Sequence, residues 1–143
     1  MSDHREPTKR ILIVDDEPDV ASYLEMLLRD HGYDTLTASN GFEAMEQARR
    51  TRPDLVTLDI SMPEASGARF YKDLKTDPSL SSIPVVIITA VTGYGGDPYG
   101  YEKFLRGRRM VPSPDGFFPK PIEPEKLLEA IRALLAAAES GVS

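Results

Sequence analysis

The sequence has no cysteine, no long apolar run and no excess of basic residues, and each absence excludes a class of protein. Without cysteine there is no disulfide, thiolate metal site or cysteine nucleophile. No apolar stretch approaches the length that a membrane span needs. The 17 basic residues are outnumbered by 23 acidic ones, which argues against binding nucleic acid through phosphate neutralisation. We therefore expect a cytoplasmic protein with no membrane span and no direct contact with nucleic acid.

Composition otherwise indicates an ordinary globular domain. The chain has 143 residues, of which 41% are apolar and 28% charged, close to the average for soluble proteins. This length fits one domain with one hydrophobic core. We expect a flexible N-terminus over residues 1–9, the domain over 10–138 and a C-terminal tail over 139–143.

Short apolar runs alternate with segments of helical periodicity. The first run, 11–14, is continuously apolar and stops at acids, as a buried parallel strand does. Alternating strands and helices predict right-handed βαβ units in an α/β fold. Five units fit the flavodoxin-like, doubly wound order 2-1-3-4-5, with about five helices. The expected strands are 11–14, 35–38, 55–58, 83–90 and 116–118, and the expected helices include 18–31, 42–50, 67–75 and a last one from 123.

One region breaks the alternation. Residues 92–116 are rich in glycine and proline, and only about 99–109 can form a helix. The fourth helix is therefore predicted to be irregular. A basic cluster lies within it, which is either a solvated loop or a docking patch for an acidic partner. This cluster consists of Lys103, Arg106, Arg108 and Arg109.

Polar residues follow the predicted strands at their carboxyl ends. Asp15-Asp16, Asp59, Thr89 and Lys120 each end or follow a different strand. In open α/β sheets ligands bind at this edge, so we expect the side chains to converge there. Clustered carboxylates repel one another, and Mg²⁺, which prefers oxygen ligands, relieves that repulsion. An aspartate can also act as a nucleophile towards phosphorus.

These residues resemble the receiver domain of two-component response regulators, over roughly Arg10–Ala138. The resemblance implies that Asp59 is the phosphoacceptor. It also implies that Asp16 and Asp59 ligate Mg²⁺ directly, together with the backbone carbonyl of Ser61, and that Asp15 holds the metal through water. The motifs that carry the resemblance are Ile11–Glu17, Asp59 with Met62-Pro63 and Gly67, Thr89-Ala90, and Lys120-Pro121.

The same resemblance assigns the phosphoryl contacts and the switch. Thr89 would bond the phosphoryl group and move towards it, and Lys120 would pair with its oxygens. The peptide bond between Lys120 and Pro121 is expected to be cis. Phe117 stands at the family's switch aromatic, although Phe118 beside it competes and one of the two rings should face the core.

Each polar site residue also has a plainer interpretation. Asp15-Asp16 could cap a helix, and Asp59 could be a loop acid. Thr89 could be an ordinary strand residue, and Lys120 a solvated one. Because all of them end neighbouring strands, we favour the phosphotransfer site.

The resemblance implies a signalling switch and not a multiple-turnover enzyme. A histidine kinase or phosphotransfer protein would phosphorylate Asp59, and the signal would pass to a separate downstream protein. Dimerisation is possible, but the unusual segment between Thr89 and Lys120 means that the family's standard fourth-helix dimer cannot be assumed. The alternatives are a binding module independent of phosphorylation and a Mg²⁺-dependent phosphohydrolase. Against the latter, Asp15-Asp16-Glu17 does not match the Asp-x-Asp of haloacid-dehalogenase-type enzymes, and there is no cap domain.

Overall fold

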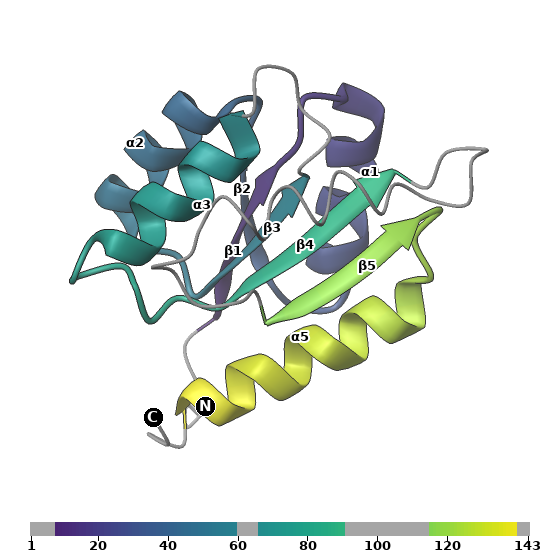
Figure 1. The fold of residues 1–143 in the computed structure, drawn as a ribbon. Coiled ribbons are helices and arrows are strands. Elements are labelled where there is room, and N and C mark those ends of the chain that lie inside the picture. Colours follow the sequence, from purple (N-terminus) through teal and green to yellow (C-terminus); the bar gives the residue numbers. More distant parts are fainter. Residues whose placement is uncertain (1–7, 60–65, 91–114, 140–143) are drawn as a thin grey trace.

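The computed structural model describes residues 8–59, 66–90 and 115–139 (Figure 1). These hold the five predicted strands and four of the predicted helices. The strands are β1 (Arg10–Val14), β2 (Asp34–Ala38), β3 (Leu55–Asp59), β4 (Val85–Ala90) and β5 (Gly116–Lys120). The helices are α1 (Pro18–Asp30), α2 (Gly41–Thr51), α3 (Ser66–Thr76) and α5 (Pro124–Glu139). None of the helices in these ranges is long and apolar enough to span a membrane.

The five strands form one parallel sheet in the order β2-β1-β3-β4-β5. This confirms the predicted flavodoxin-like order. The chain first moves outward from β1 to β2 and then crosses back to β3, so the strand order reverses between β1 and β3. Open α/β sheets form a crevice at the carboxyl ends of the strands at such a reversal.

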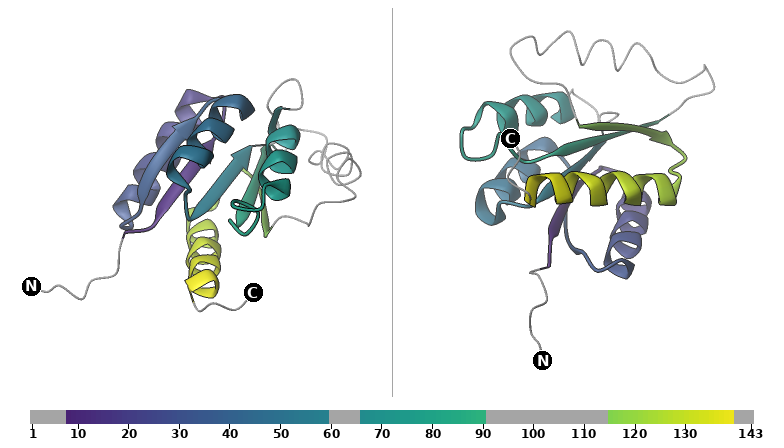
Figure 2. Two further views of the ribbon diagram at one scale, coloured as in Figure 1. Left: turned by 90° about the vertical axis from the view of Figure 1, so that its left-hand side faces the viewer. Right: turned by 90° about the horizontal axis from the view of Figure 1, so that it is seen from below.

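Two apolar cores cover the two faces of the sheet, and Figure 2 shows the sheet lying between its helix layers. Along β1, Leu12 and Val14 pack towards α2 and α3, whereas Ile11 and Ile13 pack towards α1 and α5. All four side chains are at most 1% exposed. The continuous apolar run of β1 is thus explained by burial on both faces.

Local signals fix the ends of the first two helices. Pro18 stands in the first turn of α1, where its missing N–H costs nothing. After α1 the chain turns at Gly32, whose φ of 92° suits a residue without Cβ. At α2 the Asn40 side chain accepts a hydrogen bond from the Glu43 N–H at 2.7 Å, and the Glu43 carboxylate accepts from the Ser39 N–H at 2.6 Å. These two hydrogen bonds pair backbone N–H groups at the start of α2 with side-chain acceptors and so stabilise it.

The fifth strand is longer than the sequence pattern predicts. It includes Pro119 and Lys120, which pair with Thr89 and Ala90 of β4. Because β5 is an edge strand, the missing N–H of Pro119 is tolerated there. Phe118 packs against the α1 and α5 core, whereas Phe117 is 38% exposed, so one ring does face the core as expected.

Two predictions concern residues outside the described ranges. They are the irregular fourth helix with its basic cluster and the flexible N-terminus predicted over residues 1–9, of which 1–7 are not described.

Candidate functional site

Charged residues meet at the carboxyl ends of three strands. Asp15 directly follows β1, Asp59 is the last residue of β3 and Lys120 is the last residue of β5. Asp15 and Asp59 are only 4% and 2% exposed. The Asp15 N–H donates to the Ala38 carbonyl of β2 at 3.0 Å, which extends the β1–β2 ladder and fixes where this carboxylate lies.

The Lys120 ammonium group lies among three carboxylates. Its Nζ is 3.4 Å from Asp15 Oδ2, 3.6 Å from Asp59 Oδ2 and 3.0 Å from Glu17 Oε1. The Lys120 side chain is 15% exposed. Transfer of charged groups out of water is costly unless they are paired, and Lys120 supplies that pairing for the two buried aspartates. The peptide bond that follows it, Lys120–Pro121, is cis as expected.

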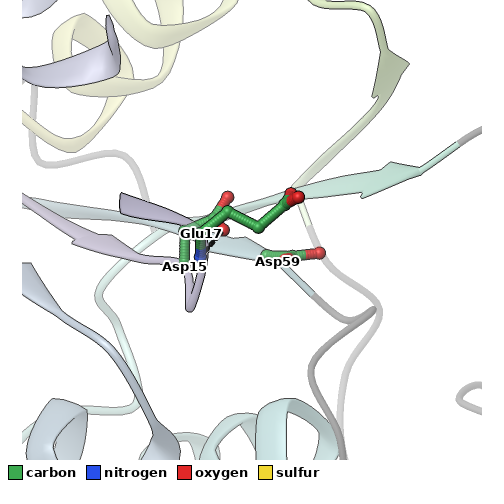
Figure 3. Close-up of side chains that lie close together, drawn as sticks. All are labelled: Asp15, Glu17 and Asp59. Carbon is green, nitrogen blue, oxygen red and sulfur yellow. Dashed lines mark hydrogen bonds between the residues drawn. The ribbon is translucent and has the colours of Figure 1, made fainter. Parts of the chain in front are cut away.

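Glu17 is the member of this cluster that the sequence analysis missed. It precedes α1 at the N-cap position, and its N–H donates to Asp15 Oδ1 at 2.9 Å. Figure 3 shows its side chain lying beside those of Asp15 and Asp59. An acid just before a helix is ordinarily explained as a cap. The pattern Asp15-Asp16-Glu17 therefore carries no signal that the third acid reaches towards β5.

Burial changes the proton affinity of the site. It raises the pKa of Asp15 from 3.8 to about 6, an increase that the nearby Asp59 carboxylate also favours. The Glu17 N–H and the Lys120 ammonium group oppose this rise. For Lys120, burial lowers the pKa, but the hydrogen bond to Glu17 and the charges of Asp59 and Asp15 outweigh it, so the pKa is raised. Lys120 therefore stays protonated as the cation of the site.

The donor set fits a hard divalent cation. Oxygens of Asp15, Glu17 and Asp59 lie within 4.8 Å of one another. Mg²⁺ takes oxygen ligands and is held in proteins through one or two carboxylates and several waters. A divalent cation would also favour the ionised carboxylates and so oppose the burial and the Asp59 charge that raise the pKa of Asp15.

The other predicted site residues are distributed around this cluster. Asp16 is exposed and, with Asp15, lines a cavity of about 240 Å³ between the start of α1 and the end of β2. The backbone of Thr89 lies in β4, opposite Pro119 of β5. Ser61 and the side chain of Thr89 lie outside the described part of the structure. The site thus unites Asp15, Asp59 and Lys120, adds Glu17, and leaves Asp16 at its margin.

Comparison with known proteins agrees with this geometry. The family model of the response regulator receiver domain matches residues 11–132. Rrf1 of Nitratidesulfovibrio vulgaris is 36% identical over 132 residues, which cover 92% of this chain and 86% of Rrf1. The DNA-binding response regulator MtrA of Mycolicibacterium smegmatis is 35% identical over 127 residues, which cover 89% of this chain but only 50% of MtrA.

A solved structure shows the same fold. It is the signal receiver domain of a signal transduction histidine kinase from Syntrophus aciditrophicus, which is 34% identical in sequence. The two superpose with a TM-score of 0.77 over 95% of this chain and 93% of that one.

Proposed function

Because this chain belongs to the response regulator receiver domain family, we propose that it accepts a phosphoryl group on Asp59 from a partner histidine kinase and signals by a conformational switch. As a receiver domain it is not a conventional enzyme. The observation that carries the proposal is the placement of Asp59. Its carboxyl group ends β3 at the reversal of strand order, 2% exposed, with the Lys120 ammonium group 3.6 Å away.

The reaction would be a phosphoryl transfer to an aspartate oxygen. Asp59 Oδ attacks the phosphorus of a phosphohistidine, or of an acyl phosphate such as acetyl phosphate. The new bond joins Asp59 Oδ to phosphorus, while the bond from phosphorus to the donor atom breaks and its electron pair leaves with the donor. Charge on the transferred oxygens is high throughout, so fixed cations nearby stabilise the transition state. Lys120 is positioned to be one of them.

Besides Lys120, we expect a divalent cation to balance the negative charge of the phosphoryl oxygens. We propose that Mg²⁺ is held by Asp16 and Asp59 with the backbone carbonyl of Ser61, and by Asp15 through water. Bound there, Mg²⁺ would supply positive charge to the oxygens of the transferred group. The close carboxylates of Asp15, Glu17 and Asp59 support a cation at this place. The adjacent Asp16 is exposed and directly follows Asp15 in the chain.

The switch would use residues that end β4 and lie in β5. Phosphorylation adds a dianionic group that Lys120 and the Thr89 hydroxyl can bond. The equilibrium between inactive and active states then shifts by the difference in how well each state stabilises that group. Phe117 is the proposed switch aromatic; its ring is 38% exposed, whereas that of Phe118 packs against the α1 and α5 core.

Partners and location are proposed on family grounds. Receiver domains imply a histidine kinase or phosphotransfer protein, and we propose a separate downstream protein as the target. We further propose residues 10–138 as the domain and the cytoplasm as its location.

Phosphorylation can be tested directly by intact-mass measurement. Wild type is incubated with acetyl phosphate and Mg²⁺ beside Asp59→Asn and Asp73→Asn, the latter a matched control in α3 that lies outside the site. We expect one phosphoryl adduct on wild type and on the control, none on Asp59→Asn, and none when EDTA removes the metal. Absence of an adduct on wild type would favour a phosphorylation-independent binding module. Sustained release of phosphate from varied phosphomonoesters would indicate a hydrolase.

A further inference from the structure

We propose that Glu17 is a positioning residue that holds the Lys120 ammonium group in the resting state and competes with the phosphoryl group for it. This inference rests on the proposed function, because the competitor is the group that Asp59 receives. It assigns Glu17 control over how readily the site is phosphorylated.

The first observation is the order of the contacts that Lys120 makes. Its shortest ion pair, at 3.0 Å, is with Glu17, whereas Asp15 and Asp59 lie at 3.4 and 3.6 Å. The Glu17 side chain is 61% exposed, but those of the two aspartates are 2% exposed. The resting ammonium group is therefore drawn towards the solvent side of the site and away from Asp59.

The second observation is that Glu17 does not do what its position in the chain predicts. As the N-cap residue of α1 it could accept a hydrogen bond from the first turn, yet its side chain makes no such bond. Its backbone is nevertheless fixed at both ends. The N–H donates to Asp15 Oδ1 at 2.9 Å, and the carbonyl accepts from the Ala21 N–H at 3.0 Å. A fixed backbone lets the carboxylate span to β5 and bond Lys120 instead.

The third observation is that the backbone of Lys120 is held in the sheet, so that a response to phosphorylation falls to its side chain. Its backbone ends β5 and is paired with Ala90 of β4. The ammonium group can therefore turn outward to Glu17 or inward to Asp59, with little movement of the strand. A phosphoryl group on Asp59 adds about −1.5 to −2 of charge and strengthens the inward attraction. Reaching it requires Lys120 to release Glu17.

Three variants separate this positioning role from a simple effect of charge. Glu17→Gln removes the charge, whereas Glu17→Asp keeps the charge but shortens the side chain by one methylene. Asp19→Asn removes a charge from the same exposed first turn of α1 and is the matched control. Glu17 is exposed, so its variants are expected to fold as wild type does.

Phosphorylation rates at saturating Mg²⁺ give the first readout, with acetyl phosphate as donor and intact mass as the measurement. We expect both Glu17 variants to be phosphorylated about two- to fivefold faster than wild type, the range that loss of one partly exposed ion pair allows. Asp19→Asn should match wild type. Affinity for Mg²⁺, measured by calorimetry, should fall in Glu17→Gln and be kept in Glu17→Asp. Rates equal to or below wild type in both Glu17 variants would overturn the proposal.

A spectroscopic readout tests the contact without any phosphorylation. The Lys120 Cε and Nζ resonances in metal-free protein should shift in Glu17→Gln but not in Asp19→Asn. In wild type they should shift again when beryllium fluoride occupies Asp59 in place of a phosphoryl group. If Lys120 gives the same signal in wild type and Glu17→Gln, the contact is not formed and the proposal fails. If wild type takes no phosphoryl group, the proposed function fails, and these resonances still decide whether Glu17 holds Lys120.

Discussion

At the scale of single residues, Asp15 has the most strongly altered chemistry in the site. Its carboxyl group is 4% exposed, and its pKa is raised from 3.8 to about 6, first by burial and then by the charge of Asp59. A raised pKa means that the fold favours the protonated form. The contribution of protonated Asp15 to the free energy of unfolding is therefore fully present below pH 3.8. This contribution is lost as the pH rises through 6.

Replacing Asp15 by Asn should therefore stabilise the metal-free protein at neutral pH. Asparagine keeps an oxygen that can accept from the Glu17 N–H and removes the buried charge. We expect Asp15→Asn to raise the free energy of unfolding by about 2 kcal/mol at pH 7.5 in EDTA. At pH 4 the difference from wild type should nearly vanish. Urea unfolding at both pH values measures it.

Asp16→Asn is the control, because it removes the charge of an exposed aspartate next to Asp15. If the free energies of unfolding of Asp15→Asn and wild type differed by the same amount at pH 4 and pH 7.5, burial of the ionised Asp15 carboxylate would not be the cause. Added Mg²⁺ should narrow the difference in unfolding free energy at pH 7.5, because a bound cation stabilises the buried, ionised Asp15 of wild type.

The sequence was sufficient to predict the residues whose role depends on where a strand ends. Asp15, Asp59 and Lys120 converge because the carboxyl ends of parallel strands share one edge. Glu17 could not be predicted in the same way. Its role depends on which way its flexible side chain points, because its partner Lys120 lies 103 residues away in the sequence. In addition, an acid before a helix is already explained as a helix cap.

At the scale of secondary-structure elements, Lys75 joins α3 to the connection that leads into β4. Its ammonium group donates to the carbonyl oxygens of Ser81, at 3.1 Å, and of Ile83. It also lies 5.9 Å from the centre of the Tyr71 ring. Burial lowers the pKa of Lys75, and the charge of Asp115 partly offsets this. These contacts satisfy backbone carbonyls that a turn would otherwise leave unpaired.

We expect Lys75→Met to destabilise the protein by about 1–3 kcal/mol, because methionine fills the space but leaves the carbonyl of the buried Ile83 without this donor. Lys72→Met on the exposed side of α3 is the matched control and should change stability by about 0.5 kcal/mol or less. Guanidinium unfolding measures both. If both variants lost the same unfolding free energy, the contribution of Lys75 to stability would come from its charge and not from its contacts with the carbonyl groups.

The boundaries of elements were predicted less well than their existence. The pattern gave the fifth strand as 116–118, because Pro119 is a poor strand residue in isolation. Its place at the sheet edge, next to β4, is what permits the strand to continue through Lys120. That placement is a property of the assembled sheet and is absent from the local sequence.

At the scale of the whole molecule, one sheet carries two separate cores. Leu74 of α3 belongs to the core on one face, and Leu127 of α5 to the core on the other. Both are completely buried. The alternation of apolar runs was enough to predict this arrangement, because a strand that is apolar at every position has to be covered on both sides.

Since both cores rest on the same strands, we expect them to unfold together. Leu74→Ala and Leu127→Ala should each lower the free energy of unfolding by about 2–5 kcal/mol, whereas Met26→Ala at an exposed position should have little effect. Tyr71 lies in one core and Tyr33 packs against the other, so tyrosine fluorescence reports on both. Fluorescence and circular dichroism should follow a single transition in each variant. Two resolved transitions would mean that the faces are independent.

The position of Lys120 in the chain has a consequence for biosynthesis. It follows Asp15 by 105 residues, so the nascent chain carries the acidic residues of the cluster long before their shared cation leaves the ribosome. Until β5 joins the edge of the sheet, burying Asp15 and Asp59 has to proceed without that ion pair. Docking of the last strand thus completes the sheet and the charge balance in one event.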